Sequence, residues 1–427
     1  MKILIWVAAW VGVLGTSLSQ ASSGGPQTIR VCPSCVETSI RKAIDGARAG
    51  AVIQVSSGTY QEEAIVIQKS IKLMGEDTGA GLPVIDGQKK VAPITIIKTD
   101  QVEISGFVIK DTGSSYVEDV AAIKVIDSKN CLIRHNRFEN TTFGIYLQRA
   151  VDCTLDDNEL RGQAKDESSG GNGIHIWSGS GHTVDNNRVS GHRDGIYLEF
   201  VSHAKILRND VRKNLRYGLH FMQSSDADYF SNYFSENGSG VAVMYSKKIQ
   251  MRDNHFVLSS GQSSYGLLLK EIHDSVIENN EFSQNTVAIF MEGSNRSKFR
   301  SNRVVGSGWA LRIMGDCEGN EFEKNDFIQN AFDVTTNSSQ SANLFKGNYW
   351  SHYSGYDLDR NGVGDVPYRP VSLSSVVLEQ IDSSYVLLNS FLFSVLDQVE
   401  RALPSMTPEP LKDEEPAMAQ FGAGVRK

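Results

Sequence analysis

Apolar and polar positions alternate in one short pattern that returns about every 22 residues through the middle of the chain. Each copy begins with a small residue, after which apolar and variable residues alternate. The copies are Gly144-Ile-Tyr-Leu147, Gly173-Ile-His-Ile176, Gly195-Ile-Tyr-Leu198, Gly218-Leu-His-Phe221, Gly240-Val-Ala-Val243, Gly266-Leu-Leu-Leu269, Ala288-Ile-Phe-Met291 and Ala310-Leu-Arg-Ile313. Such alternation predicts a β-strand with one buried side.

An asparagine two residues before an apolar residue recurs in phase with these strands. The asparagines are Asn136, Asn158, Asn187, Asn209, Asn232, Asn254, Asn280, Asn302, Asn325 and Asn348. Their spacing is 22 to 29 residues, and the longer intervals hold polar loops at 163–171 and 259–264. Asparagine tolerates the left-handed backbone conformation of a tight turn, and its amide can bond along a stack of identical turns.

A unit of 22 residues with two or three short strands cannot enclose a hydrophobic core alone. Stacked units can, because each coil pairs with the next at about 4.8 Å. The repeat therefore predicts an all-β fold: a right-handed parallel β-helix, or solenoid, of about 22-residue coils. Leucine-rich repeats and propellers fit less well, since the former need a helical stretch in each unit and the latter a Trp-Asp signature.

The repeat also suggests domain boundaries. Residues 39–49 are amphipathic and predict a short N-terminal capping helix that covers the open edge of the first coil. With the apolar runs that follow it, the parallel β-helix is expected to span residues 28–370. Residues 385–396 are apolar at nine of twelve positions, which favours a C-terminal helical segment within 371–403 that docks on a membrane partner. Residues 404–427 are expected to form a flexible tail.

Residues 1–21 have the pattern of a secretory signal peptide. Lys2 precedes an apolar stretch at 3–14, and small residues at 19–21 offer a cleavage site. Twelve apolar residues are too few to span a bilayer. We therefore expect the mature chain in an oxidising, periplasm-like compartment. The net charge of −8 argues against a nucleic-acid partner.

Strand alternation places side chains of possible chemical interest on the outside of the central coils. Leu219 and Phe221 are expected to face the core, so His220 and Met222 face out. Met244 lies one coil later, 22 residues on, and should stack on Met222. Imidazole and thioether ligands suit Cu(I). Packing beneath a loop or against a partner subunit is the alternative, because methionine often fills such surfaces.

An oxygen-rich loop near the end of the repeats contains Asp357, Asp359, Asn361 and Asp365. Alternating carboxylate and amide groups, with a glycine at the sixth place, match the first half of a calcium-binding loop. The twelfth place holds Tyr368 instead of glutamate, so the EF-hand pattern is incomplete. A polar capping turn without metal is the alternative.

Four cysteines form two pairs by their spacing. Cys32 and Cys35 make a CxxC near the mature N-terminus, for which a local disulfide is the prediction and metal binding or thiol exchange the alternatives. Cys131 and Cys153 are 22 residues apart and share one column of adjacent coils. Buried unpaired thiols are the ordinary interpretation there, and the spacing also allows a disulfide between coils.

A carbohydrate-active β-helix enzyme, either a polysaccharide lyase or an epimerase, is the rival function. It would need carboxylates and a basic residue in an exposed groove, and candidates are Lys270, Glu271 and Glu292 on one side and Arg193, Asp194 and Glu199 on another coil. A salt-bridged, solvated wall explains these residues too. A third interpretation, an adhesin or structural solenoid, would not need the apolar C-terminal segment.

From residue 171 onward the chain resembles the NosD family, periplasmic accessory proteins for the maturation of nitrous-oxide reductase. The resemblance rests on GHRDGIYLEF (191–200), NLRYGLHFM (214–222), GVAVMYS (240–246), SYGLLLKEI (264–272), NYWSHYSGYDLDRNGVGDVPYRP (348–370) and TPEPLKDEEPAM (407–418). The earlier coils are generic for sugar-binding and sugar-hydrolysing β-helices. They would not by themselves separate this family from a lyase.

The resemblance implies a non-enzymatic binding subunit of an ABC-type transporter. Its implied partners are a membrane permease subunit, a cytoplasmic ATPase, a copper chaperone as donor, and nitrous-oxide reductase, whose copper centres are assembled. It implies a periplasmic protein, attached to the membrane through its partner, with Cu(I) as a transient cargo. His220, Met222 and Met244 are then the first candidate ligands; Met406, Met418 and the Cys32–Cys35 pair come next. Whether the cargo is copper, sulfur or neither stays open.

Overall fold

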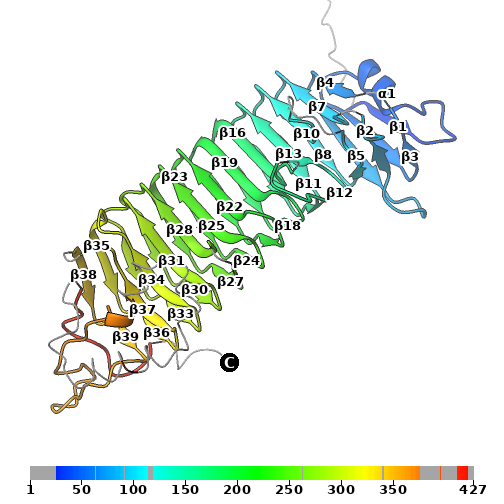
Figure 1. Cartoon of the computed structure of the whole chain (residues 1–427). Helices are drawn as coiled ribbons and strands as arrows, with labels where there is room; N and C mark the ends of the chain where they lie inside the picture. Colours follow the sequence, from blue (N-terminus) through cyan, green and yellow to red (C-terminus); the bar gives the residue numbers. More distant parts are fainter. Residues whose placement is uncertain are drawn as a thin grey trace, which may run out of the picture.

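The computed structural model describes residues 26–421 except 63, 91, 114–118, 169, 262, 339–340, 376–394 and 396–410. The strands form one elongated stack of coils, with the two ends of the described chain at opposite poles (Figure 1). The strands pair in parallel, which confirms the predicted right-handed parallel β-helix and gives it about 14 turns. The predicted signal peptide at 1–21 lies outside the described residues.

The first face of the solenoid carries the Gly-x-x-x strands of the repeat. Its strands are β4 (Ile65–Ile67), β7 (Ile94–Ile97), β10 (Ala121–Ile126), β13 (Phe143–Gln148), β16 (Ile174–Ser180), β19 (Asp194–Ser202), β22 (Tyr217–Met222), β25 (Ser239–Met244), β28 (Tyr265–Lys270), β31 (Val287–Glu292), β34 (Trp309–Ile313) and β37 (Phe332–Thr335). These strands are the longest in most coils, so they offer the broadest outer surface.

The second face follows the first in each coil. It consists of β1 (Thr28–Val31), β2 (Ala51–Ser56), β5 (Ile71–Glu76), β8 (Glu103–Ser105), β11 (Leu132–Arg134), β14 (Thr154–Asp156), β17 (Thr183–Asp185), β20 (Lys205–Leu207), β23 (Ser225–Phe230), β26 (Lys247–Arg252), β29 (Val276–Glu278), β32 (Lys298–Arg300), β35 (Glu318–Glu323) and β38 (Ala342–Lys346).

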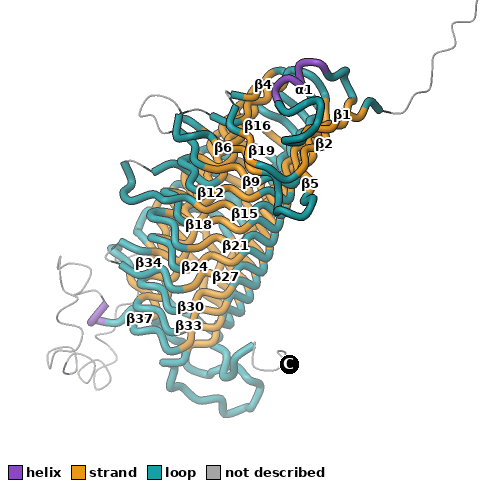
Figure 2. Tube along the Cα trace, turned by 90° about the vertical axis from the view of Figure 1, so that its right-hand side faces the viewer, coloured by secondary structure: helices purple, strands orange, loops and turns teal. Residues whose placement is uncertain are grey.

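The third face forms a separate ladder, seen along the length of the molecule in Figure 2. It consists of β3 (Thr59–Tyr60), β6 (Val84–Asp86), β9 (Val108–Lys110), β12 (Arg137–Glu139), β15 (Glu159–Arg161), β18 (Arg188–Ser190), β21 (Asp210–Arg212), β24 (Tyr233–Ser235), β27 (His255–Val257), β30 (Glu281–Ser283), β33 (Arg303–Val305), β36 (Asp326–Ile328) and β39 (Tyr349–Trp350). From β12 to β39, each strand begins directly after a repeat asparagine.

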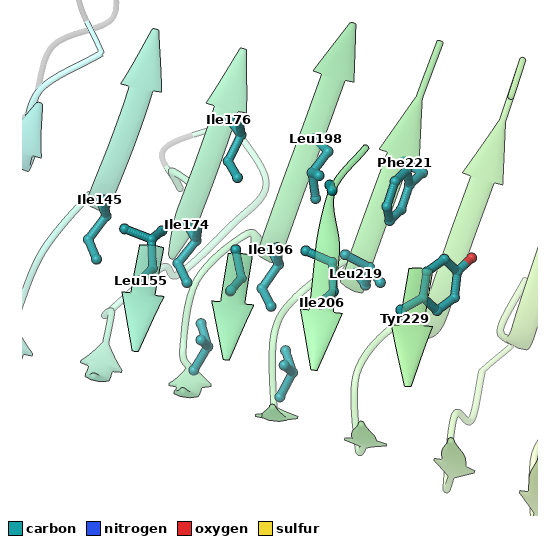
Figure 3. Packing of buried hydrophobic residues seen from close by; sticks show 14 of the residues in the cluster. Ile145, Leu155, Ile174, Ile176, Ile196, Leu198, Ile206, Leu219, Phe221 and Tyr229 are labelled. Atoms are coloured by element: carbon teal, nitrogen blue, oxygen red, sulfur yellow. The ribbon is translucent and has the colours of Figure 1, made fainter. Parts of the chain in front are cut away.

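The inward residues of the three faces fill one continuous core. On the first face, Ile174 pairs with Ile196 and Ile196 with Leu219, and all three are fully buried. They point toward residues of the second face such as Ile206 and Tyr229 (Figure 3). Removing such a side chain from water contributes roughly 2 kcal/mol, so the periodic apolar positions supply most of the drive to stack coils.

The repeat asparagines form a buried ladder along the axis. The Asn187 Nδ2 donates to Asn209 Oδ1 at 3.0 Å and to the Leu155 carbonyl at 3.0 Å, and the backbone N–H of Asn187 donates to the same Oδ1 at 2.9 Å. The left-handed conformation falls on the residue before each asparagine, as at Arg208 with φ 50°. The predicted use of the amide is confirmed, but the expected left-handed role of these asparagines is wrong.

The predicted N-terminal capping helix is present as α1 (Ile40–Gly46), which lies over the first coil in Figures 1 and 2. It buries Ile40 and Ile44 against that coil. The Glu62 carboxylate accepts hydrogen bonds from the N–H groups of Ile40 at 2.6 Å and Arg41 at 2.9 Å. The helix thus covers apolar surface that the first coil would otherwise expose.

The C-terminal end differs from the expectation. Val371 is buried and pairs with Val334, and Ser375 is also buried, so the solenoid domain continues past residue 370. The predicted helical segment over 371–403 lies mostly outside the described residues. Residues 411–421, expected to belong to a flexible tail, instead pack on the last coil, where Asp413 pairs with Phe345.

Asp413 terminates the asparagine ladder. Its Oδ2 accepts hydrogen bonds from Asn348 N at 3.0 Å, Asn348 Nδ2 at 2.9 Å and Trp350 Nε1 at 3.1 Å, while Oδ1 accepts one from Gly347 N at 3.0 Å. The carboxylate is fully buried. It takes the place that the amide oxygen of the next asparagine would occupy, so a segment distant in the sequence satisfies the last donors of the stack.

Both cysteine pairs that the spacing suggested are disulfide-bonded in the structure. Cys32 and Cys35 form the expected local disulfide. Cys131 and Cys153 also form a disulfide, between adjacent coils, so the interpretation of two unpaired thiols does not hold. Cys317 is a free, buried thiol, and burial raises its pKa to about 12. Within the described residues, no helix has both the length and the apolar character to cross a bilayer.

Asp413→Ala should lower the free energy of unfolding by about 2–4 kcal/mol, because it leaves several buried N–H donors of the last coil without an acceptor. Hydrogen exchange of the amides at 347–350 should speed up in parallel. Asp413→Asn, which keeps one acceptor oxygen, should lose less. Glu414→Ala is the control, since its side chain is 61% exposed. Unchanged melting and exchange in Asp413→Ala would contradict this role.

Candidate functional site

Two outward columns of the first face bring the candidate copper ligands together. In one column Tyr197 pairs in register with His220, and in the next Met222 pairs with Met244. The predicted stacking of the two methionines across adjacent coils is therefore confirmed, as is the outward direction of His220 between the core residues Leu219 and Phe221. Both methionines are partly exposed.

Aromatic rings lie against one another along the first of these columns, with the Tyr146–His175 pair stacked and the next two pairs tilted. We call Tyr146, His175, Tyr197, His220 and Tyr217 the aromatic stripe. Successive ring centroids are 4.5, 4.8 and 4.7 Å apart from Tyr146 to His220, and the Tyr217 ring lies 4.9 Å from His220. The neighbouring rings cover His220, which is only 5% exposed. His220 therefore faces outward as predicted, and its burial by these rings is a feature that strand alternation did not predict.

An ion pair between half-buried Arg216 and fully buried Asp194 lies on one side of His220. The Arg216 guanidinium binds the Asp194 carboxylate through Nε at 2.9 Å and through Nη2 at 2.5 Å. His220 Nδ1 lies 3.4 Å from Asp194 Oδ2. Burial would raise the pKa of Asp194, but the hydrogen bonds from His220 and Arg216 outweigh it and lower that pKa to about 2. Asp194 is therefore a carboxylate across the physiological range.

The second ring nitrogen of His220, Nε2, is buried and has no hydrogen-bond partner among the described residues. The Tyr197 hydroxyl donates toward the Met222 sulfur at 3.7 Å, which joins the two columns. Phe200 and Tyr245, at the ends of the strands that carry this site, are 49% and 48% exposed. A histidine nitrogen and two thioethers thus lie on adjacent coils of one outer surface.

A loop inserted between the asparagine repeats covers the other end of the stripe. A side chain at Gly171 would place its Cβ 2.7 Å from the Phe143 ring, so glycine allows the loop to approach closely. Arg193 donates to Asn172 at 3.1 Å, and Asn172 Nδ2 lies 3.5 Å from His175 Nδ1. His175 is buried as well, and its burial, together with the nearby Arg193 charge, lowers its pKa to about 3.

Most of the residues that surround His220 were not predicted from the sequence. His220, Met222 and Met244 were named, but Asp194 was assigned to the rival sugar chemistry and Arg216 was not considered. A signal was present, because successive repeats place Tyr or His at the same outward position in Tyr146, His175, Tyr197 and His220. An aromatic at one column in four consecutive coils predicts ring stacking.

Four of the charged residues proposed for sugar chemistry are held in ion pairs or hydrogen bonds. Lys270 and Glu292 form an ion pair at 3.1 Å, and Asp194 is bound by Arg216. Arg193 donates to Asn172. This pattern agrees with the salt-bridged wall that the sequence also allowed.

The loop that holds Asp357, Asp359, Asn361 and Asp365 is closed by its own hydrogen bonds. Asp357 accepts from Asn361 N at 3.1 Å and Gly362 N at 2.9 Å, and Asp365 accepts from Leu358 N at 2.7 Å. Partial desolvation acts to raise the pKa of Asp357, but the hydrogen bonds to its carboxylate outweigh this effect and lower that pKa. Over the described part of the chain, no three His, Cys, Asp or Glu side chains are grouped closely enough to hold a metal ion.

The fold and the outer surface define a parallel β-helix protein with its candidate binding site on the outside of the coils. A family model described as periplasmic copper-binding protein (NosD) matches residues 163–355, and one described as rhamnogalacturonase A/epimerase, pectate lyase-like, matches residues 36–241. Relatives named probable ABC transporter binding protein NosD are 28% identical in Stutzerimonas stutzeri, covering 86% of each chain, and 29% identical in Pseudomonas aeruginosa, covering 76% and 79%. Over these residues the chain is similar to the NosD family.

Solved structures with the same fold have other functions. The A-module of the Azotobacter vinelandii mannuronan C-5 epimerase AlgE6 has a TM-score of 0.59 at 13% identity, covering 72% of this chain and 93% of that one. The Streptococcus pneumoniae surface adhesin PfbA has a TM-score of 0.56 at 13% identity, covering 73% and 89%. At these identities the likeness shows the fold alone.

Three buried histidines make the stability of the fold depend on pH. Burial lowers the pKa of His175 to about 3 and of His182 and His192 to about 4, from an ordinary value of 6.5. Below pH 6.5 the unfolded chain therefore binds protons that the folded chain excludes. The stabilisation is complete above that pH and decreases as the pH falls toward the folded-state values.

The melting temperature should accordingly fall as the pH is lowered from about 7 to about 4. His175→Phe keeps a ring in the stripe but removes one titrating group, so its melting temperature should fall less steeply over this window. His203→Gln, at an exposed turn position, should keep the wild-type slope. An unchanged slope in His175→Phe would contradict the assignment.

Proposed function

We propose that this chain is a periplasmic binding subunit of an ABC-type transporter that handles copper during assembly of the copper centres of nitrous-oxide reductase. It holds Cu(I) transiently through His220, Met222 and Met244. The observation that carries the proposal is the unpartnered Nε2 of His220 on the same outer surface as two stacked methionines. The descriptions of the family and of the relatives, copper-binding and ABC transporter binding protein, support it.

The ligand types fit a transfer role. Imidazole and thioether donors favour Cu(I) over hard cations such as calcium or magnesium. Two or three ligands with an open side release a metal more readily than a closed site does. The methionines are the partly exposed members, so a donor such as a copper chaperone would meet them first.

Docking on the membrane permease, and through it on the cytoplasmic ATPase, is assigned to the segment within 371–403. The Thr335 hydroxyl hydrogen bonds to the carbonyl of buried Ser375 at 3.4 Å, and Leu411 is buried where the chain returns. Both connections of the segment are thus fixed on the last coil. Tyr356 and Leu358, 55% and 79% exposed, add apolar surface on a loop at that end.

We also propose that the loop of Asp357, Asp359, Asn361 and Asp365 binds a calcium-like cation that fixes the C-terminal end. Carboxylate and amide oxygens are the ligands such an ion prefers. The loop contacts the returning C-terminal segment, since Gly364 N donates to the Pro416 carbonyl at 2.8 Å and Met418 N to the Gly362 carbonyl at 3.0 Å. An ion there would stabilise the contact between the two segments.

Met222→Leu combined with Met244→Leu should weaken Cu(I) binding at least about tenfold, roughly 1.4 kcal/mol, without unfolding the solenoid. Leucine conserves the volume and removes the thioether. Competition with a chromophoric Cu(I) chelator measures the affinity. Met291→Leu, a buried inward methionine of the same face, is the matched control and should bind as the wild type does.

Unchanged stoichiometry and affinity in the double variant would move the site to Met406, Met418 or the Cys32–Cys35 pair; Met406 lies outside the described residues. Turnover of alginate or pectin with no Cu(I) uptake by the wild type would instead favour the carbohydrate-active enzyme. Both measurements use the same purified protein.

Replacing residues 376–403 by a flexible linker should leave a folded solenoid that no longer co-purifies with the membrane permease. Val371, Ser375 and Asp413 stay in place, because each is buried in the last coil. Wild-type melting of the variant establishes that the fold is intact. Retained co-purification would place the docking surface elsewhere.

Calcium should raise the melting temperature of the wild type in proportion to the logarithm of its concentration, and a chelator should reverse the effect. Asp359→Ala should abolish this response because it removes one ligand from the loop. Glu318→Ala, at an exposed position of a neighbouring coil, should respond as the wild type does. If calcium affects wild type and Asp359→Ala equally, the loop is a polar turn without metal.

A further inference from the structure

The aromatic stripe contains two buried histidines in the same column, and the groups beside their Nδ1 atoms differ in chemistry. His175 meets a side-chain amide, whereas His220 meets a carboxylate. In both rings Nε2 is buried and has no partner among the described residues. A neutral imidazole carries one proton, so the partner at Nδ1 decides whether Nε2 is a donor or an acceptor.

The surroundings of His175 leave Nε2 protonated. Arg193 Nη2 donates to Asn172 Oδ1 at 3.1 Å, which fixes the orientation of that amide. The Asn172 Nδ2 group therefore faces His175 Nδ1, at 3.5 Å. An amide NH2 group only donates, so Nδ1 must accept and the ring proton is on Nε2. A protonated Nε2 cannot bind a metal.

The surroundings of His220 have the opposite effect. Asp194 Oδ2, 3.4 Å from His220 Nδ1, only accepts. Arg216 Nη2 is 3.5 Å from the same Nδ1 and donates one of its two N–H groups to the Asp194 carboxylate, 2.5 Å away. The negatively charged carboxylate is the nearer of the two groups and favours a ring N–H at Nδ1. Nδ1 therefore donates to Asp194, and the lone pair is on Nε2. Carboxylates hold metal-binding histidines in this way in many proteins.

We infer that Asp194 is a positioning residue that fixes the tautomer of His220 with an acceptor Nε2, while Asn172 fixes His175 in the opposite tautomer. The consequence rests on the proposed function: of two similar buried histidines, only His220, beside Met222, can bind the copper ion. The Asp194 carboxylate does not touch the metal. It acts through the ring, with Arg216 holding it in place.

The tautomers can be read directly in the metal-free wild type by long-range proton–nitrogen NMR of protein with 15N-labelled histidine, near neutral pH. Signals are assigned with His175→Gln and His220→Gln. The expected result is a protonated Nε2 in His175 and a protonated Nδ1 in His220. A His220 ring with its proton on Nε2 overturns the inference, whether or not the protein binds copper.

Two exchanged variants test the cause. Asp194→Asn offers an amide that can donate to Nδ1, so the His220 proton should move to Nε2 and Cu(I) affinity should fall at least about tenfold. Asn172→Asp should move the His175 proton to Nδ1 with little effect on Cu(I) affinity. A purely structural Asp194 would change melting without changing the tautomer, which also overturns the inference.

The outcomes separate this inference from the copper proposal. If the tautomers are as expected and the wild type takes up no Cu(I), the proposed function fails while the role of Asp194 in holding His220 is supported. If Cu(I) binds through the methionines but His220 carries its proton on Nε2, the proposed cargo is supported and the inference fails. Should Asp194→Asn not fold, the wild-type spectrum still decides.

Discussion

Hydrogen bonding along the axis of the solenoid is the constraint on which the rest of the structure depends. Each main-chain group and ladder amide must find its partner on the neighbouring coil, about 4.8 Å away. The first and last coils each lack one neighbouring coil, and other groups provide the missing contacts there. At the first coil a short helix, anchored by Glu62, covers the edge. At the last coil Asp413 accepts the remaining ladder donors. The returning C-terminal segment is thus part of the fold.

The same constraint creates the outer site without any dedicated loop. Because coils repeat in register, outward residues fall into columns at the spacing of stacked rings, and the measured centroid distances of 4.5 to 4.8 Å match it. Aromatic side chains in consecutive coils therefore pack against and shield one another. His220 becomes buried on an outer surface, next to the ion pair of Asp194 and Arg216. Met222 and Met244 come adjacent through the same register.

The 22-residue period of the sequence predicted the features that recur in every coil, and few of the others. The inward residues and the asparagine column were visible because every coil repeats them, and the pairing of Met222 with Met244 follows from one 22-residue step. Asp413 was missed because it lies 65 residues beyond its partner Asn348 and belongs to no repeat. The burial of His220 was missed because alternation along a strand gives the direction of a side chain and not what the neighbouring coils place over it.

The interruption of the repeat decides how the stripe meets its surroundings. The inserted loop at 163–171 lengthens one coil, and Gly171 lets it close over the Phe143 and His175 end. The next coils, up to the loop at 259–264, return to the short period, and Met222 and Met244 in these coils stay partly exposed beside Phe200 and Tyr245. The stripe is therefore asymmetric: a covered end, where the histidine is held as a donor, and an open end, where the unpartnered nitrogen of His220 lies beside the thioethers. Exchange of a ligand with a partner protein is favoured at the open end, because only there do the ligating side chains reach the surface.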